Sequence, residues 1–296
     1  CLITWLILYI GGYQSLEKIL LAMVFTFSIV TLIIAIAMQS TPFSIQAVDI
    51  LGGLSFKFPT EHTALALAVF GFTGISYGEI MAYTYWCKEK GYSNHDGDPK
   101  QVKNWIKTMQ TDVWITVFLV TIGTIPFFLL GASILNSQGL YPPPNGDIIQ
   151  TLLVMFTSIL GEWARWFFIP LTFFVLFSTF LSGTAAFTRT ISDYFISMGL
   201  IVEKASTRQT LIHYIAFLIP AFSCLAYFIL PNPILLLMIA GIWAALGLPI
   251  VNIGALYLVN KLDKELQPSN LTKIILTITL VFQLGIAGLL IFSQMS

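Results

Sequence analysis

The stretch GFTGISYGEIMAYTYW (Gly71–Trp86) carries the residues whose types and spacing could do chemistry. The stretch contains Gly71, Gly74 and Gly78, and an acid, Glu79, directly follows the last of them inside an otherwise apolar segment. Each glycine in a helix interior costs about 1 kcal/mol relative to alanine, so a helix unwinds most easily here. Unwound backbone inside a membrane frees carbonyl oxygens that can coordinate a cation. The stretch therefore predicts a cation site at a broken helix, with Glu79 beside the freed carbonyl groups near Gly74.

The same residues also allow a purely structural interpretation. Small side chains spaced three or four apart let membrane helices pack closely, and such spacing is common where nothing binds. Glu79 could then be a protonated acid or the partner of a structural cation. An acid at the depth of the bilayer is costly unless it is paired, binds a cation or faces a watery cavity, and this favours the site.

Composition shows which solvent surrounds this stretch. Hydrophobic residues make up 57% of the 296 residues, charged residues only 9%, and the mean hydropathy is +0.86. Soluble domains carry about 25% charged residues. Several apolar runs reach the ~20 residues that a bilayer-spanning helix needs, and lipid requires every backbone group to be bonded internally. We therefore expect an all-α polytopic membrane protein, with residues 1–296 forming a single membrane domain.

Several function classes lose support from the same composition. The 14 basic and 14 acidic residues balance, so nothing favours nucleic acid as a partner. Cys1, Cys87 and Cys224 are scattered, without the spacing of a zinc site or a disulfide framework. The sequence shows no nucleophile–base pair and no nucleotide-binding loop. We therefore expect neither an enzyme nor a bound cofactor.

Apolar runs separated by polar turns define the expected helices. Segment 1–11 is apolar but too short to span, so it is predicted to be the end of a truncated helix whose beginning is missing. Seven full transmembrane helices are predicted at 16–38, 62–86, 113–135, 166–190, 211–230, 234–259 and 272–292. Segment 88–112 is the most polar and is predicted to be a loop with an amphipathic lead-in near its end.

The distribution of basic residues predicts the orientation of these helices. Alternating sides along the chain leaves only Lys57 and Arg165 on one face and the other 12 of the 14 basic residues on the opposite face. Cytoplasmic loops carry the excess of Lys and Arg. Segment 88–112 is therefore predicted to be cytoplasmic, and the loops at 39–61 and 138–147 are predicted to lie outside.

The order of these elements and their motifs resembles a known family. GGYQSLEK precedes a helix, and then come the glycine-broken helix, a basic loop leading to DVW, and helices with LLGASIL, LFSTFLSGTAAFTR and LGLPIVNIGAL. Together they resemble the C-terminal two-thirds of the natural-resistance-associated macrophage protein (NRAMP) family of divalent-metal transporters, in a divergent bacterial branch. The resemblance implies a LeuT-like fold of two inverted five-helix repeats plus one added helix. It also implies that the family's first helix, with an Asp and an Asn ligand, is missing from this chain, and with it half of the metal site.

The chain departs from the family pattern at the broken helix. The best register puts Gly74 at the family's carbonyl ligand and Ser76 at its methionine ligand. Tyr77 and Gly78 then stand at the proline and the histidine, and Glu79 follows. Thioether sulfur suits softer transition metals, whereas carboxylate, hydroxyl and carbonyl oxygens suit Mg²⁺, Ca²⁺ or Mn²⁺. We therefore expect Gly74, Ser76 and Glu79 to bind a harder cation, Mn²⁺ or Mg²⁺, as the transported substrate.

Three groups could carry protons in place of the family's histidine. Glu79 is the first, because a low dielectric favours the neutral form of a carboxyl and so lets it take up a proton. His213 and Asp112 are the others, although each could simply cap a helix at the membrane interface. Asn252, which follows Pro249, could contact the substrate from the helix at 234–259.

A stripe of hydroxyl side chains on the helix at 166–190 has two possible roles. The residues are Ser178, Thr179, Ser182, Thr184 and Thr188. They could line a permeation path. Hydroxyl groups in membrane helices more commonly bond to neighbouring backbone, and that alternative stays open.

The predicted function is proton-coupled transport of a divalent cation by alternating access, in the inner membrane of a bacterium. The predicted partners are the cation, protons and the lipid bilayer. One alternative is a carrier of an amino acid or another organic solute with the same architecture, although Glu79 would repel an anionic substrate group. A second alternative is a membrane subunit without transport activity, in which the glycines serve only to pack helices.

Overall fold

The computed structural model describes residues 1–10, 13–55, 63–92, 99–140, 148–202 and 205–295, and within these ranges it contains helices and no β-strand. The chain divides into two compact units, unit 1 (Cys1–Ser55 and Val113–Asn232) and unit 2 (Phe56–Asp112 and Pro233–Ser296). The elements are α1 (Leu2–Ile10), α2 (Tyr13–Met38), α3 (Ala47–Gly53), α4 (Thr63–Phe72), α5 (Tyr77–Glu89), α6 (Pro99–Leu130), the π-helix η2 (Gly131–Asn136), α7 (Ile148–Leu160), α8 (Ala164–Ser197), α9 (Ala205–Ile229), α10 (Pro233–Val259) and α11 (Asn270–Met295).

Six helical segments of the described chain are long and apolar enough to cross a membrane. They are α2, α6 together with η2, α8, α9, α10 and α11. The remaining predicted span, 62–86, consists of two shorter helices, α4 and α5, with a non-helical connection between them. The protein is therefore the all-α polytopic membrane protein that its composition predicts.

Two expected loops contain helix. Helix α6 begins at Pro99, so much of segment 88–112 is helical; proline suits the first position of a helix, where its missing N–H has no intrahelical partner. Helix α3 lies within the predicted loop 39–61, and the Gln46 backbone N–H donates to Asp49 Oδ2 in a capping box at its start. The rest of that loop from residue 56, and residues 141–147 of the other outer loop, lie outside the described residues.

Unit 1 has an apolar core where α2, η2, α7 and α8 meet. Met38, Ile134 and Phe156 are fully buried in it. Ser133 within the π-helical turn η2 donates a hydrogen bond to the backbone carbonyl of Phe43, in the segment after α2. This polar contact ties the end of α6–η2 to the α2–α3 connection.

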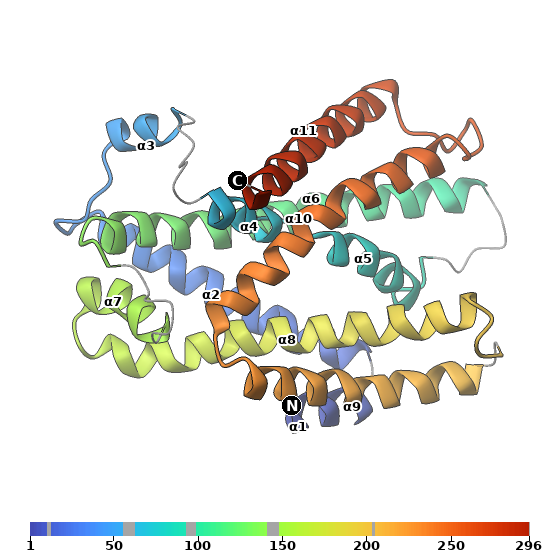
Figure 1. Cartoon of the computed structure of the whole chain (residues 1–296), viewed down its shortest axis with the longest axis horizontal. Helices are drawn as coiled ribbons and strands as arrows, with labels where there is room; N and C mark the ends of the chain where they lie inside the picture. The colour runs from blue at the N-terminus through green and yellow to red at the C-terminus, as the bar shows by residue number, and fades with distance from the viewer. Residues whose placement is uncertain (11–12, 56–62, 93–98, 141–147, 203–204, 296) are drawn as a thin grey trace. The chain divides into compact units, whose positions relative to one another are not determined.

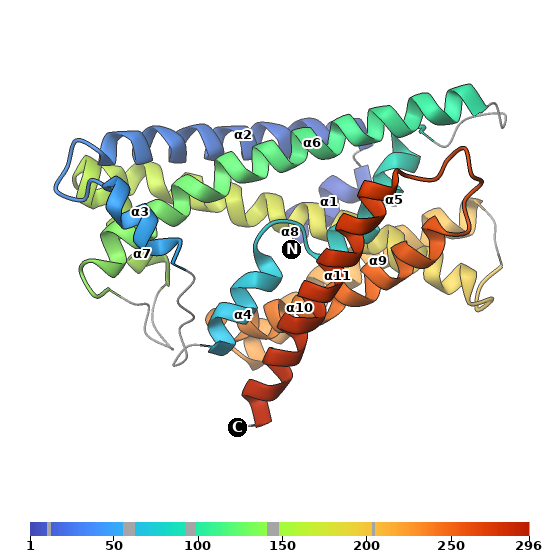
Figure 2. The ribbon, with the colours of Figure 1, turned by 90° about the horizontal axis from the view of Figure 1, so that it is seen from above.

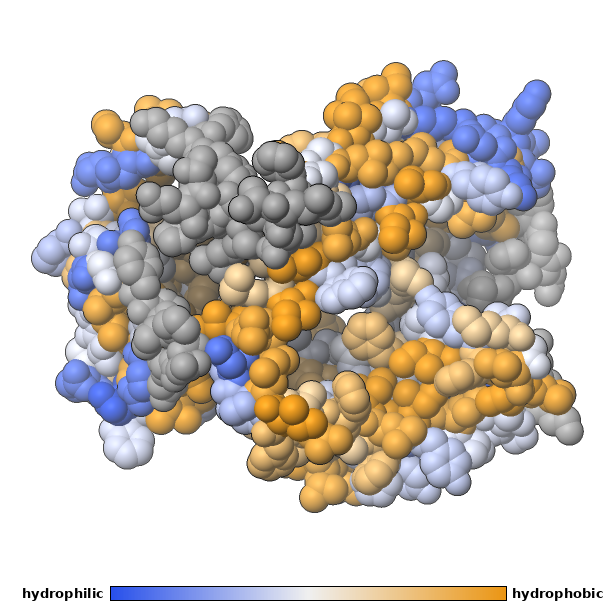
Figure 3. Space-filling view, in the orientation of Figure 1, coloured by the Kyte–Doolittle hydropathy of each residue, from blue (hydrophilic) through white to orange (hydrophobic). Residues whose placement is uncertain are grey.

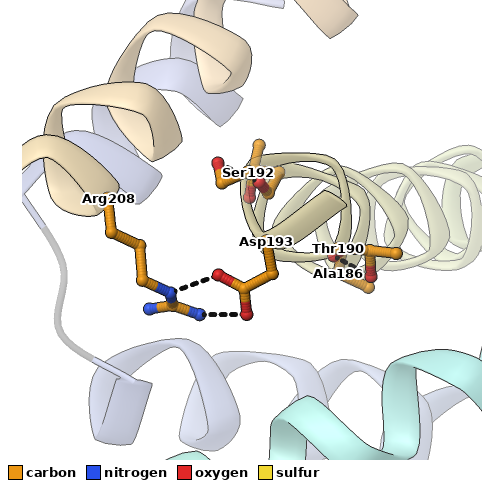
Figure 4. Close-up of polar contacts among 6 residues, drawn as sticks. Ala186, Thr190, Ser192, Asp193 and Arg208 are labelled. Carbon is orange, nitrogen blue, oxygen red and sulfur yellow. Dashed lines mark hydrogen bonds and ion pairs between the residues drawn. The ribbon is translucent and has the colours of Figure 1, made fainter. Parts of the chain in front are cut away.

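Helices α8 and α9 of unit 1 run side by side (Figure 1). Near the turn that joins them, the Arg208 guanidinium donates from Nε to Asp193 Oδ1 (2.6 Å) and from a terminal nitrogen to Oδ2 (3.1 Å), as Figure 4 shows. Both side chains are about three-quarters buried. Two parallel bonds from a guanidinium to a carboxylate are geometrically specific, so this pair sets the relative position of the two helix ends.

Unit 2 is built around α10, which packs against α4, α5 and α11. In Figure 2 the chain of α4 turns away before α5 begins, while α10 and α11 continue as long helices. The buried residues of α10 are mostly small or apolar, among them Gly241, Ala245 and Leu248. One face of α10 is therefore shaped for close helix contacts.

Exposed side chains on the flanks of the long helices are largely apolar, as the orange surfaces in Figure 3 show. Hydrophilic residues gather where α10 turns into α11, at Asn260–Asn270. This distribution is the one that a lipid environment requires, because the helix flanks face hydrocarbon and the turns face water.

Candidate cation site at a broken helix

The predicted weak point of the helix at 62–86 is a break. Helix α4 ends at Phe72 and α5 begins at Tyr77. Gly74 in the connection has φ of +88°, a conformation that glycine adopts readily and that costs other residues roughly 1–2 kcal/mol. The reversal of the backbone at Gly74 is what ends the first helix and separates it from the second.

The end of α4 presents backbone oxygens. The Val69 carbonyl accepts hydrogen bonds from the Thr73 backbone N–H (2.8 Å) and from Thr73 Oγ1 (2.7 Å). Thr73 thus satisfies the Val69 carbonyl, but helix ends in general leave up to four carbonyl groups without an intrahelical donor, and the helix dipole adds partial negative charge at this end. The C-terminus of α4 is therefore a local environment that favours a cation.

The start of α5 gives Glu79 a structural role in addition to the predicted chemical one. Ser76 is the N-cap residue and Glu79 stands three positions later, and together they form a capping box. The Ser76 backbone N–H donates to Glu79 Oε2 at 2.5 Å, and the Glu79 side chain is otherwise exposed. A carboxylate at a helix N-terminus is stabilised by the dipole. The pattern Ser-x-x-Glu is visible in the sequence and was the signal that could have revealed this cap.

The glycines of the stretch have different roles. A Cβ added at Gly71 would lie 2.0 Å from the Gly241 carbonyl oxygen and 2.8 Å from the Ala245 nitrogen, so α4 and α10 touch backbone to backbone. A Cβ added at Gly74 would meet no atom within 4 Å. Close packing therefore explains Gly71, and backbone conformation explains Gly74. The two interpretations of the glycines apply to different residues.

Helix α10 also supports the second half of the break. A Cβ added at Gly247 would lie 2.6 Å from Cδ1 of Tyr77, so the ring of the first α5 residue packs directly on the α10 backbone. Since α4 rests on Gly241 and α5 rests on Gly247, both half-helices are held by the same helix. The geometry of the break is thus fixed by α10 as well as by its own sequence.

Asn252 lies on α10, and its polar contacts are to α11. Its Nδ2 donates to the Gln283 side-chain oxygen (3.1 Å) and to the Leu276 carbonyl (3.4 Å). The side chain is 7% exposed. These contacts make Asn252 part of the α10–α11 interface, and its contact with the substrate stays a prediction.

The other proton candidates make local contacts at helix ends. Asp112 on α6 accepts hydrogen bonds from the Tyr92 hydroxyl (2.8 Å) and from Lys90 Nζ (3.4 Å), which ties α6 to the end of α5. The His213 ring on α9 lies 4.7 Å from the Tyr9 ring, centroid to centroid, and its Nε2 is 3.2 Å from Gln209 Nε2. Such contacts fit the interfacial roles left open above, and a role in proton transfer stays a prediction.

The hydroxyl stripe of α8 bonds to its own helix. Ser178 and Thr179 both donate to the Val175 carbonyl at 3.0 Å, and Thr184 donates to the Phe180 carbonyl at 2.7 Å. Ser182 and Thr188 likewise donate to carbonyl groups three residues before them. Side chains that return to their own backbone hold the polar groups within the helix, in agreement with the commoner of the two roles.

The break offers oxygen atoms of three kinds to a cation. They are the terminal carbonyl groups of α4, the Ser76 hydroxyl and the Glu79 carboxylate. Among the residues that the structure describes, no group of three or more His, Cys, Asp or Glu side chains is placed to hold a metal ion. Cation binding at the break between α4 and α5 would therefore depend on backbone oxygens together with the single carboxylate of Glu79.

Six continuous apolar spans and one span interrupted by an unwound segment define a class, the helical membrane transporters with discontinuous helices. The family model for natural resistance-associated macrophage protein-like proteins matches residues 1–293, so the chain belongs to the NRAMP family, whose members move divalent metals and have a LeuT-like fold. Among curated proteins and among solved structures, none matches the chain significantly.

Proposed function

We propose that this chain is part of a secondary transporter that moves Mn²⁺ or Mg²⁺ by alternating access and is coupled to protons. The observation that carries the proposal is the break between α4 and α5, where carbonyl groups end one helix and Glu79 caps the next. Half-helix ends of this kind place charge-complementary groups around an ion at the bilayer midplane. Family membership supports divalent cations as the substrate class.

The preference for a hard cation rests on the donor atoms. Gly74 supplies backbone next to the freed carbonyl groups, and Ser76 and Glu79 supply oxygen from their side chains, with no sulfur among the three. Oxygen ligands favour Mg²⁺ and Mn²⁺, whereas thioether sulfur favours softer metals. A clear preference for Cd²⁺ over Mg²⁺ in transport would contradict this part of the proposal.

Proton coupling requires that the proton and the cation use different groups at the same moment. If the Glu79 carboxylate binds the cation, it cannot carry the co-transported proton in that state. Asp112 and His213 are then the candidate carriers. If Glu79 instead carries the proton, its bond from the Ser76 N–H weakens on protonation, because a charged acceptor binds about twice as strongly as a neutral one.

We place the protein in the bacterial inner membrane, with residues 88–112 on the cytoplasmic side. The support is the distribution of basic residues, which leaves only Lys57 and Arg165 on the opposite face. Labelling of single cysteines introduced at Lys100 and Lys57, in a variant whose Cys1, Cys87 and Cys224 are replaced by serine, with a reagent that does not cross the membrane, tests this orientation. Labelling of the Lys57 position alone in intact cells is the expected result.

The test of function is cation uptake into proteoliposomes by the full-length gene product. Mn²⁺ and Mg²⁺ are offered separately across an imposed pH gradient to the wild type and to Glu79→Gln. Glu162→Gln is the matched control, because Glu162 is an exposed acid whose ion pair in the described part of the chain is with Arg165, at 3.5 Å, three residues away. Saturable uptake in the wild type and the control, lost in Glu79→Gln at equal protein yield, is expected.

Two outcomes would contradict the proposal. Absence of uptake for both metals, from well-folded protein, would shift the assignment to organic solutes. Equal uptake by Glu79→Gln and by the wild type would reduce Glu79 to its capping role. Glutamine can also serve at this position of a capping box, so the substitution removes the charge without removing the cap.

A further inference from the structure

The two half-helices of the break contact α10 in different ways. At Gly71, an added Cβ would meet the carbonyl oxygen of Gly241 and the nitrogen of Ala245, so backbone touches backbone. At Gly247, an added Cβ would lie 2.6 Å from Cδ1, 2.7 Å from Cγ and 3.0 Å from Cε1 of Tyr77. The position of α4 on α10 is therefore set by the two main chains, whereas the position of the start of α5 depends on one aromatic ring.

Tyr77 stands in the chain between the two side chains of the candidate site. It is the first residue of α5, Ser76 directly precedes it as the N-cap, and Glu79 follows two residues later. Further along α5, the Tyr83 hydroxyl donates to the Met109 carbonyl of α6 at 3.2 Å, which holds the far part of this helix. A shift of α5 at Tyr77 therefore carries the hydroxyl and carboxylate oxygens with it, since both lie within one helical turn of that residue.

Helix α4, the other half of the break, is held on two sides. It packs along α10 and also against α11, where the rings of Phe70 and Phe282 meet edge to face with their centroids 5.8 Å apart. The carbonyl groups at the end of α4 are therefore the fixed half of the candidate site. The oxygens of Ser76 and Glu79 are the half whose position a single side-chain contact can change.

A methyl group at position 247 cannot be accommodated by a flip of the Tyr77 ring. Carbon atoms in ordinary contact lie ~3.5–4.0 Å apart, so a Cβ at 2.6 Å requires the ring to retreat by about 1 Å. Rotation about χ2 leaves Cγ in place, so Cγ moves only if χ1 changes or the α5 backbone shifts. Few χ1 rotamers are open to an aromatic residue in a helix, and close-packed side chains transmit strain to the backbone. The start of α5 is therefore expected to move away from α10.

We propose that Tyr77 is a positioning residue for the transported cation, and that the packing of its ring on Gly247 sets the distance between the α4 carbonyl groups and the oxygens of Ser76 and Glu79. This inference rests on the proposed function and deepens it, since Tyr77 acts through its two neighbours. Binding groups must be held within about 0.5 Å of their productive geometry, and the displacement that a methyl group at position 247 imposes is larger. The contact between Tyr77 and Gly247 therefore determines the affinity for the cation.

Equilibrium binding of Mn²⁺ to the purified full-length protein tests this inference without requiring transport. Free Mn²⁺ is measured by its electron paramagnetic resonance signal for the wild type, Gly247→Ala, Tyr77→Ala and the double variant. We expect Gly247→Ala to raise Kd about tenfold, which corresponds to about 1.4 kcal/mol. In the Tyr77→Ala background the added methyl group meets no ring, so Gly247→Ala should there change Kd by less than about twofold.

The conservative variant and a matched glycine separate positioning from folding. Tyr77→Phe retains the three ring carbons of the contact and should keep the wild-type Kd, whereas Tyr77→Ala should raise Kd. Gly254→Ala is the matched control in α10, because an added Cβ there meets nothing within 4 Å, and it too should keep the wild-type Kd. Tm is measured on the same preparations, since a merely structural contact would lower Tm and leave Kd unchanged.

The outcomes distinguish this inference from the proposed function. A wild type that binds Mn²⁺, with an unchanged Kd in Gly247→Ala and Tyr77→Ala, overturns the positioning role and leaves the proposed function standing. An equal rise in Kd on Gly247→Ala with and without the Tyr77 ring also overturns it. If Gly247→Ala fails to fold, the comparison of Tyr77→Ala with Tyr77→Phe decides, and equal Kd values for these two variants overturn the inference. A wild type that does not bind Mn²⁺ contradicts both.

Discussion

Helix α8 and the α4–α5 pair contain similar residues, but α8 is continuous and the α4–α5 pair is interrupted. Helix α8 carries Ser182, Gly183 and Thr184 in its middle and remains helical from Ala164 to Ser197. The α4–α5 segment carries Thr73, Gly74 and Ser76 and is interrupted there. Glycine and hydroxyl residues alone therefore do not break a membrane helix, and the difference must lie in what surrounds them.

The difference is the start signal of a new helix. Ser76 is followed three residues later by Glu79, and the two close a capping box that satisfies backbone N–H groups of α5. Ser182 is followed three residues later by Ala185, and its hydroxyl bonds back to the Thr179 carbonyl. A break in a membrane helix costs less free energy when the start of the new helix is capped, because uncapped backbone N–H groups have no water to bond in lipid.

The largest effect is expected where the α4–α10 contact leaves no room. Gly71→Ala places a Cβ 2.0 Å from the Gly241 carbonyl oxygen, and both partners are backbone, so the helices must separate. Overpacking of this kind costs roughly 1–3 kcal/mol, and occasionally more. Thermal unfolding of the detergent-purified protein should show the loss. Gly183→Ala in α8, where an added Cβ meets nothing within 4 Å, should be neutral or slightly stabilising. Equal Tm values for the two variants would contradict the packing role of Gly71.

The next effect is expected at the end of α8. Asp193→Asn removes the charge that binds the Arg208 guanidinium and leaves that cation about three-quarters buried without its counter-ion. Hydrogen bonds to charged groups contribute about 1.5–3 kcal/mol. The comparison is Glu162→Gln, whose pair with Arg165 is exposed and is worth at most roughly 0.5 kcal/mol. Asp193→Asn should lower Tm clearly more than Glu162→Gln does. If the loss of Tm in Asp193→Asn is seen at low salt and disappears at high salt, the Asp193–Arg208 pair is solvated and weaker than proposed.

A smaller loss is expected for Gly74→Ala. The side chain has space, so the cost is the positive φ alone, roughly 1–2 kcal/mol. The substitution should reduce cation uptake more than it reduces Tm, because the strain acts on the carbonyl groups beside the break. Uptake assays and thermal unfolding on the same preparation separate the two effects. Uptake that falls only in step with the yield of folded protein would assign Gly74 to folding.

The smallest effect is expected for Ser76→Ala. This substitution tests directly whether the cap distinguishes the start of α5 from the uninterrupted helix α8. Loss of an N-cap hydroxyl typically costs about 1 kcal/mol. Ser182→Ala removes a hydroxyl that bonds back to its own helix and should leave the free energy of unfolding nearly unchanged. Hydrogen exchange of the α5 amides by mass spectrometry should increase in Ser76→Ala. Unchanged exchange in α5 would show that the capping box is not what holds the start of that helix.

Much of the fold follows from sequence patterns with local causes. Length and hydropathy predict seven spans, since a helix must cover the bilayer whatever its neighbours are; six of the described helices are long and apolar enough to do so, and the seventh predicted span is the α4–α5 pair. Glycine propensity locates the break near Gly74. The polarity of segment 88–112 predicts a loop, but α6 begins at Pro99, because a polar stretch can extend a membrane helix into water.

The candidate site was predictable only in part. Gly74, Ser76 and Glu79 were chosen for cation chemistry, and their joint position at the break is found in the structure. The capping role of Glu79 follows from the Ser-x-x-Glu spacing, but the same acid in an apolar segment also has the chemistry of a cation ligand, so the spacing and the residue type indicate different roles. Asn252 bonds to Gln283 and Leu276 across the α10–α11 interface, a partnership that its own sequence does not reveal, and its contact with the substrate stays a prediction.

The sequence by itself determined the membrane environment, the positions of the long helices, the weak point of the helix at 62–86 and the family. Each depends on residues within one or two helical turns, or on composition. The tertiary structure alone decided which glycine packs and which one bends, and that Asp193 meets Arg208 and Asn252 meets Gln283. The physical reason is that a contact between helices depends on the rotation and depth of both partners, and no local pattern in one helix specifies the other.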